Sequence, residues 1–165
     1  MGIQPTAERL RELLDYDPAS GIFTWNVRTS NRIKIGDRAG SRHGGGYLQI
    51  NIDGSNHLAH RLAWLYVHGA WPNEIIDHIN GDRSDNRIAN LRNVTPEVNA
   101  QNVRRPGIAN TSGALGVSWS RKERKFVAYV SVRDKSLYVG SFDSVADAHA
   151  AYLAAKRKLH VGCTI

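Results

Sequence analysis

The sequence predicts an α+β protein made of two small domains, and three observations lead to that prediction. Stretches with the alternating apolar pattern of strands are interspersed with stretches that have the period of a helix. Residues 103–112 combine Arg-Arg, Pro-Gly and small polar residues, a composition typical of a linker. The positive charge is concentrated on the C-terminal side of that segment. A length of 165 residues suffices for one ordinary domain or two small ones.

The charge of the chain is distributed unevenly. There are 22 Lys and Arg residues against 15 Asp and Glu residues, which gives a formal net charge of +7. Residues 1–102 hold eleven of each sign, whereas residues 103–165 hold eleven basic and four acidic side chains. A basic module beside a neutral one indicates nucleic acid as a partner, with one part that binds and another that acts on it. The alternative is a soluble basic domain without such a partner.

The composition excludes several other classes of protein. The single cysteine, Cys163, excludes a disulfide framework and a cysteine-based zinc site. Hydrophobic residues make up 41% of the chain, too many for a disordered tail. No apolar run approaches the roughly 18–20 residues that cross a bilayer. The charged, amphipathic N-terminus has no apolar signal core. We therefore expect a soluble protein of the cytoplasm.

Short helices and strands are expected to alternate in the N-terminal domain, 1–102. Leu10, Leu13 and Leu14 place an apolar face on a helix over 7–14. Pro96 fits the first position of a later helix, where its missing N–H costs nothing. Strands are expected over 22–25, 47–53, 74–80 and 91–95, further helices in the second half of 57–69 and from Thr95 onward, and a loop over 28–46. That loop, rich in Arg, Ser and Gly, either lies along a phosphate backbone or is simply flexible.

The C-terminal domain, 113–165, is predicted to hold three strands and one helix. The strands are expected within 113–120, 125–132 and 136–142, and the helix over 144–160 with Ser144 as its N-cap. In the middle strand, Phe126, Ala128 and Val130 should face the helix, and Lys125, Tyr129 and Ser131 should face outward. Six alanines should let the helix and the sheet approach closely: Ala146, Ala148, Ala150, Ala151, Ala154 and Ala155.

The segment from His60 to Asn102 carries the residues best suited to chemistry. Asp77 and His78 end an apolar strand, Asn90 follows His78 by 12 residues, and Asn99 follows it by 21. Hydrolysis of a phosphodiester needs a base to deprotonate water and a cation to neutralise charge on the phosphate. A neutral histidine can accept that proton. Asp and Asn offer oxygen ligands to a hard divalent ion such as Mg²⁺.

The block from Ala59 to Asn102, with DH, GD, NRIANLR and the helical Asn in order, resembles the HNH nuclease family, especially its phage homing-type branch. The upstream segment GYLQINIDGSNHLAHR fits the same family. A lone DH would be weak, but the elements at this spacing are specific together. The resemblance implies a ββα-metal finger, in which two strands and a helix surround one cation. The core of the nuclease domain would therefore span 47–102.

The resemblance assigns a role to each of four residues. His78 would be the general base that activates water, and Asn90 would orient it and brace the finger loop. Asp77 and Asn99 would be the metal ligands. Because Asn99 stands where many family members have His, the motif is H-N-N, and an amide oxygen favours Mg²⁺ or Mn²⁺ over Zn²⁺.

The other polar and aromatic residues of this domain are expected to be structural. Asp82, Asp85 and Asn86 are expected to form the loop rather than to bind metal. His60 is expected to pack or to contact phosphate. The surface histidines are expected to be His43, His57 and His68, and the core tryptophans Trp64 and Trp71.

Residues 110–162 resemble the AP2/ERF DNA-binding domain, through GVSW, KFVAYVSV, LYVGSFDS and the helix ADAHAAYLAA. In that family the three-stranded sheet enters the major groove and the helix packs on its back. Plant members carry arginines where this chain has Ser118, Ser120 and Ser131. Because arginine is the usual reader of guanine, guanine-rich recognition is not expected here. Trp119 is expected to pack in the core.

The cations of this domain lie in the turns, which suits contacts to the phosphate backbone. The alternative is that they are ordinary solvated hairpin tips. The predicted DNA-binding residues, which include two from the linker and two exposed tyrosines, are Arg104, Arg105, Arg121, Lys122, Arg124, Lys125, Tyr129, Arg133, Lys135 and Tyr138.

Taken together, these patterns predict a homing-type DNA endonuclease that uses one divalent metal ion, Mg²⁺ or Mn²⁺. Its partner would be double-stranded DNA, its location the cytoplasm of the host if the gene belongs to a phage, and no membrane or small-molecule cofactor is expected. Two other hypotheses remain: a DNA-binding regulator whose nuclease half is inactive, and an RNA-binding module.

Overall fold

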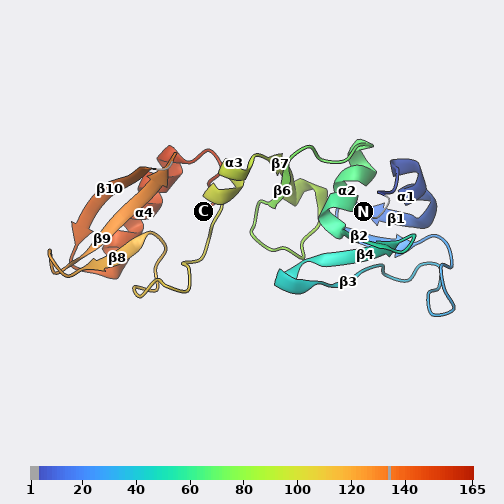
Figure 1. Ribbon diagram of the computed structural model, residues 1–165, viewed down its shortest axis with the longest axis horizontal. Helices are drawn as coiled ribbons and strands as arrows, with labels where there is room; N and C mark the ends of the chain where they lie inside the picture. The colour runs from blue at the N-terminus through green and yellow to red at the C-terminus, as the bar shows by residue number, and fades with distance from the viewer. Residues whose placement is uncertain (1–3, 134) are drawn as a thin grey trace. The chain divides into compact units, whose positions relative to one another are not determined.

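A computed structural model describes residues 4–133 and 135–165, which divide into two compact units, Met1–Thr95 and Pro96–Ile165 (Figure 1). The helix at 96–101 and the predicted linker, 103–112, both belong to the second unit. Two contacts within that unit explain why: the Lys156 ammonium donates to the Val103 carbonyl at 2.6 Å, and the Gly162 amide donates to Gln101 Oε1 at 2.9 Å. Within the described residues, the helices are all too short or too polar to traverse a bilayer.

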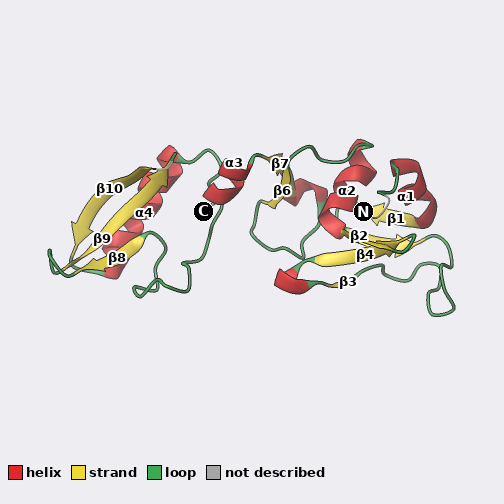
Figure 2. Cartoon of the chain, viewed as in Figure 1, coloured by secondary structure: helices red, strands yellow, loops and turns green. Residues whose placement is uncertain are grey.

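The first unit mixes two main helices with small antiparallel sheets (Figure 2). Its elements are α1 (Ala7–Leu13), β1 (Leu14–Asp17), β2 (Ile22–Trp25), β3 (Ser41–Arg42), β4 (Leu48–Ile52), β5 (Ser55–Leu58), α2 (Ala59–His68), β6 (Ile75–His78) and β7 (Leu91–Val94), with short 3₁₀ turns η1 (Gly44–Gly46) and η2 (Ile88–Asn90). The sheets are β1–β2, β3–β4–β5 and β6–β7. The mixture of helices and antiparallel strands agrees with the predicted α+β class.

The first helix begins and ends where local chemistry dictates. The Thr6 side chain accepts from the Arg9 amide and caps α1, and Leu14 takes extended backbone angles that end it. Leu14 therefore starts a strand. The helix was expected to include Leu14, because Leu14 continues the apolar pattern of Leu10 and Leu13. Strand β1 pairs with β2 in a hairpin.

The hairpin β1–β2 packs against the loop that carries the candidate site. At Gly21, where φ is +73°, a side chain would lie 2.4 Å from the Arg87 amide nitrogen, so only glycine fits. The Tyr16 hydroxyl donates to the Asn86 carbonyl at 2.7 Å. These contacts fix the position of residues 86 and 87.

The core of the first unit joins α1, the β1–β2 hairpin, α2 and the inner faces of β4, β6 and β7. Leu10, Leu14 and Leu62 are completely buried there. Trp64 and Trp71 pack against this core while remaining partly exposed. The burial of Ile76 and Leu91 anchors the β6–β7 pair on the core, which leaves the ends of those strands to present polar residues.

The second unit consists of α3 (Pro96–Gln101), a sheet of β8 (Val117–Ser120), β9 (Lys125–Val132) and β10 (Lys135–Phe142), and α4 (Val145–Leu159). The sheet is antiparallel in the order β10–β9–β8, and α4 packs on one face of it (Figure 1). Ser144 caps α4 by accepting from the Asp147 amide, as predicted.

The alternation predicted for the middle strand is confirmed at its centre. Ala128 and Val130 are fully buried against α4, whereas Tyr129 and Ser131 are exposed. Gly116 approaches the helix so closely that a side chain would lie 2.1 Å from the Tyr152 ring. Of the six alanines, Ala148 is buried in this contact, while Ala146, Ala150 and Ala154 face solvent. The prediction that Trp119 belongs to the core is wrong: Trp119 lies on the same side of the sheet as Val117 but is 48% exposed, and its ring packs edge-on against Phe126.

Candidate active site

The candidate site is built on the β6–β7 pair and the loop between the two strands. Asp77 and His78 end β6, and their ladder partners on β7 are Arg92 and Leu91. Because Ile76, Asp77 and His78 are all buried, the strand end lies under the surface of the unit. The strand therefore presents a carboxylate and an imidazole, side by side, in a partly dry environment.

Asn90 holds the loop closed. Its side-chain oxygen accepts from the Asn80 amide at 2.9 Å, its side-chain nitrogen donates to the Asp85 carbonyl at 2.8 Å, and its own carbonyl accepts from the Ile79 amide. These bonds join the two ends of the loop around the buried amide of Asn90. The structure thus places Asn90 as a brace of the finger loop.

Asn86 reaches the His78 ring with its side chain. The distance between His78 Nε2 and Asn86 Oδ1 is 3.3 Å, and both residues are buried. Burial lowers the pKa of His78, while the Asn86 contact and nearby carboxylates oppose that change. The imidazole is accordingly neutral at pH 7. From the sequence, Asn86 was expected only to form the loop, and no spacing rule distinguishes it from Asn80 or Asn90.

Asp77 is held by a guanidinium. Arg92 Nε and Nη2 both donate to Asp77 Oδ2, at 2.9 and 2.7 Å. The two residues face each other across the β6–β7 ladder, so the strand pairing itself places Arg92 beside Asp77. The two hydrogen bonds from one guanidinium fix the direction of the Asp77 side chain.

The remaining carboxylates of the loop are engaged in the loop itself, as predicted. Asp82 accepts from the amide and the hydroxyl of Ser84. Asp85 accepts from Arg87 and Asn80, and the Arg87 guanidinium is the main reason that the pKa of Asp85 falls to about 2. Among the three acids of this hairpin, Asp77 is the one that precedes His78 directly on β6.

The residues fit a hard cation better than a soft one. Within 4–133 and 135–165, no three His, Cys, Asp or Glu side chains gather as a metal-binding group. The ligand set implied by the resemblance is instead one carboxylate, Asp77, and one amide, Asn99, which suits Mg²⁺ more than Zn²⁺. Asn99 lies half-buried in α3, within the second unit. Its assignment as a ligand stays a prediction.

A second histidine and a tyrosine pack against His78. The ring of His60, in the first turn of α2, lies 5.0 Å from the ring of His78 at nearly a right angle. The Tyr47 ring lies 5.2 Å from His60 and 6.0 Å from His78. Burial, and then the charges of His78 and Arg61, lower the pKa of His60 to about 3. Of the two expectations for His60, the structure shows packing.

The predicted DNA-binding residues of the second unit lie mostly on its surface. Arg121, Lys122 and Arg124 occupy the exposed turn between β8 and β9, and Arg133 and Lys135 flank the turn between β9 and β10. Exceptions are Lys125, which pairs with Asp143 at 3.2 Å, and Arg104, which donates to the Thr164 carbonyl at 3.0 Å. Arg105 is exposed. The Tyr129 and Tyr138 rings lie 5.5 Å apart on the open face of the sheet.

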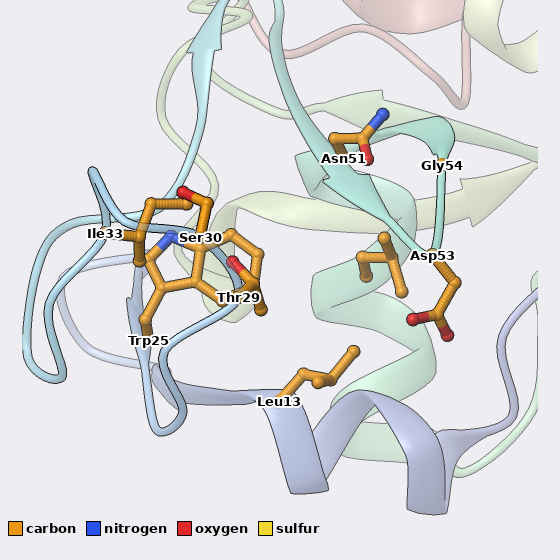
Figure 3. Close-up of a pocket in the computed structure, with 9 residues that line it drawn as sticks. Leu13, Trp25, Thr29, Ser30, Ile33, Asn51, Asp53 and Gly54 are labelled. Atoms are coloured by element: carbon orange, nitrogen blue, oxygen red, sulfur yellow. The ribbon is translucent and has the colours of Figure 1, made fainter.

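A separate pocket of about 330 Å³ lies in the first unit, between the segment after β2 and the β4–β5 turn (Figure 3). Trp25 and Ile33 line one side, and Asn51, Asp53 and Gly54 the other. Asp53 is tied to Arg9 by two hydrogen bonds. Neither Asp77 nor His78 lines this pocket.

Comparison with known proteins gives two similarities. The HNH endonuclease family matches residues 57–101, a stretch that contains Asp77, His78, Asn90 and Asn99. Protein 3.8 of Escherichia phage T7 is 31% identical over 102 residues, which make up 61% of this chain and 83% of that protein. No solved structure matches.

Proposed function

Because the chain belongs to the HNH endonuclease family, we propose that it is a DNA endonuclease that hydrolyses phosphodiester bonds with the help of one divalent metal ion. The observation that carries this proposal is the buried pair of Asp77 and His78 at the end of β6, with the His78 ring held by Asn86. A surface ion pair would not need this arrangement. A catalytic base does, because its ring must be neutral and fixed in direction.

His78 is the proposed general base. In the tautomer that donates its Nε2–H to Asn86 Oδ1, the lone pair lies on Nδ1. Nδ1 would take a proton from water as the water oxygen attacks phosphorus. The bond between phosphorus and the 3′-oxygen then breaks, and that oxygen takes up a proton to become a hydroxyl. The lowered pKa of His78 keeps the base unprotonated at neutral pH.

Asp77 and Asn99 are the proposed metal ligands, the second by resemblance. A divalent cation, Mg²⁺ in our proposal, would neutralise charge on the phosphate and on the leaving oxygen. Arg92 supports this role by orienting the Asp77 carboxylate through two hydrogen bonds. A partner that positions a metal ligand in this way typically changes activity 10- to 100-fold when removed.

The second unit is the proposed DNA-targeting module, similar to an AP2/ERF domain. A three-stranded sheet with one covered face leaves Tyr129 and Tyr138 exposed on the other. Exposed basic side chains occupy the turn between β8 and β9 and lie at the turn between β9 and β10. Such cations would bind the phosphate backbone, while the tyrosines and serines would meet the bases. The protein as a whole would act as a phage homing endonuclease in the cytoplasm of the host.

Cleavage of plasmid DNA tests this proposal. Supercoiled plasmid and the cognate phage DNA are incubated with the wild type and with His78→Ala, each with Mg²⁺ and with EDTA. We expect relaxed or linear product only for the wild type with Mg²⁺. If no DNA is cut in a way that depends on metal and on His78, but the protein still binds DNA, the chain is a DNA-binding regulator and the nuclease proposal is wrong.

A further inference from the structure

Arg83 lies at the candidate site without a role in the chemistry described above. It follows His78 by five residues in the loop between β6 and β7. Its guanidinium carbon lies 5.0 Å from the centre of the Tyr47 ring, and its Nη1 donates to the Gly45 carbonyl at 2.9 Å. Two segments far apart in sequence, the turn at 43–47 and the finger loop, therefore meet through this arginine.

Tyr47 connects Arg83 to His78. The Tyr47 ring, over which the Arg83 guanidinium lies, is 6.0 Å from the His78 ring and also packs against His60. The guanidinium thus lies within about 11 Å of the proposed base. Successive phosphates of one strand advance about 3.4 Å along the duplex axis. A cation at this distance from the base therefore reaches the phosphate under attack or one of its near neighbours.

The charge of Arg83 is not neutralised by a carboxylate. Among the described residues it forms no ion pair, whereas Arg87, in the same loop, is paired with Asp85 at 2.6 Å. A guanidinium has five N–H donors, and the Gly45 carbonyl uses one of them. The side chain is exposed. The positive charge of Arg83 and most of its N–H donors are therefore available to a ligand from solution.

The turn at 43–47 is shaped to receive this arginine. Gly45 and Gly46 have φ values of +75° and +88°, and the His43 amide donates to the Tyr47 carbonyl to close the turn. A side chain at Gly45 would lie 3.3 Å from Arg83 Nη1, which is tighter than an ordinary contact. Glycine therefore permits the close approach that fixes the guanidinium in place, and a fixed cation loses less entropy on binding.

We propose that Arg83, held by Tyr47 and Gly45, binds a phosphate of the DNA strand beside the bond that His78 attacks. This inference rests on the proposed nuclease function. An arginine matches a phosphate with two parallel hydrogen bonds, so it fixes direction as well as distance. By anchoring the strand next to the site, Arg83 would place the scissile bond opposite His78.

The test measures DNA binding and cleavage separately in the full-length protein. The affinity for a fluorescent duplex of arbitrary sequence is measured in EDTA over a range of KCl concentrations, so no cleavage occurs. For Arg83→Ala we expect the slope of log affinity against log salt to become shallower by about 0.9, the value of one phosphate contact. With Mg²⁺, KM for DNA should rise about tenfold and kcat should change less than KM.

Two further variants control the interpretation. Arg83→Lys keeps the charge and should keep the slope of the wild type. Arg87→Ala removes a loop arginine that is already paired with Asp85, and should leave slope and KM unchanged. Thermal unfolding verifies that every variant is folded.

Two results would overturn the inference: an unchanged slope in Arg83→Ala, or an equal change in Arg87→Ala. Because the slope is measured without metal, it does not depend on cleavage. A wild type that binds with the expected slope but never cuts DNA would instead contradict the nuclease proposal and leave the phosphate contact standing.

Discussion

In the first unit, His60, Asp77 and His78 are 5%, 7% and 4% exposed, whereas in the second unit Trp119, Tyr129 and Tyr138 are 48%, 39% and 55% exposed. The first unit thus buries these three side chains, and hydrogen bonds hold two of them, Asp77 and His78. The second unit leaves these aromatic side chains exposed, and Tyr129 and Tyr138 pair on the open face of its sheet.

This contrast agrees with the proposed division of roles, chemistry in the first unit and DNA binding in the second. A catalytic base has to be held in one direction and kept neutral, which requires burial and a partner such as Asn86. A surface that binds a long duplex has to be open and bordered by cations. Variants in the first unit should therefore change the rate of cleavage and the response to acid, and variants in the second unit should change affinity and its dependence on salt.

The largest effect is expected from acid acting on His60. Its pKa is 6.5 as a free side chain and about 3 in the folded protein. As the pH falls below 6.5, His60 becomes protonated in the unfolded chain but stays neutral in the folded protein. The free energy of unfolding therefore decreases until the pH reaches about 3. Between pH 7 and pH 4 this amounts to about 3 kcal/mol.

Urea unfolding of the wild type and of His60→Gln at the two pH values measures this loss. Glutamine does not titrate, so the variant should lose about 3 kcal/mol less than the wild type between pH 7 and pH 4. His43→Gln, in an exposed turn, is the control and should lose as much as the wild type. Equal losses in His60→Gln and the wild type would contradict the burial of His60.

The next largest effect is expected at Asn86, which holds the His78 ring. Asn86→Ala should lower kcat about 10- to 100-fold, because the imidazole loses the partner that fixes its direction. Asn86→Asp, which keeps an oxygen at that place, should recover part of the rate. Asn51→Ala, in an exposed hairpin, serves as the control. Cleavage by Asn86→Ala at the wild-type rate would show that Asn86 does not position His78.

A smaller effect, confined to binding, is expected from the hairpin turns of the second unit. Replacing Arg121, Arg124 and Arg133 together by alanine should weaken DNA binding about tenfold and make the salt slope shallower by about 0.9 for each phosphate that the protein no longer binds. The rate at saturating DNA should remain that of the wild type. A loss of rate without a loss of affinity would contradict the division of roles between the units.

The smallest effect is expected at Trp119. Because its ring is about half exposed and contacts mainly Phe126, Trp119→Ala should lower the free energy of unfolding by no more than about 1 kcal/mol. Val130→Ala, at a fully buried position of the same sheet, should cost about 2 kcal/mol. If Trp119→Ala were the more damaging of the two in chemical denaturation, Trp119 would belong to the core after all.

The sequence predicted most of the fold because its signals are local. The period of Leu10 and Leu13, the cap at Ser144 and the alternation around Ala128 each depend on neighbours in the chain, and each is confirmed. Strand β1 was missed because a strand that begins directly at the end of a helix has no turn signal before it. Trp119 was placed wrongly because alternation gives the side of a sheet on which a residue lies but not how far the burial extends along it: Val117 is buried on that side, whereas Trp119 is about half exposed.

Only those residues of the candidate site that belong to a sequence motif could be predicted. The neighbouring pair Asp77 and His78 is visible in the sequence, but the contact between His60 and His78 is made across 18 residues by the packing of α2 on the core. The same holds for Tyr47 and Arg83, which meet only in the folded unit. Asn86 could not be distinguished from the other loop asparagines, since its role depends on the hairpin that holds its backbone.

The rate of DNA cleavage by His78→Ala, measured at saturating DNA with Mg²⁺ and alongside its DNA affinity, tests the central claim most directly. We predict a rate at least about 100-fold below that of the wild type with unchanged affinity, and a normal rate for the control His43→Ala. Cleavage by His78→Ala within about threefold of the wild type would contradict the assignment of His78 as the general base.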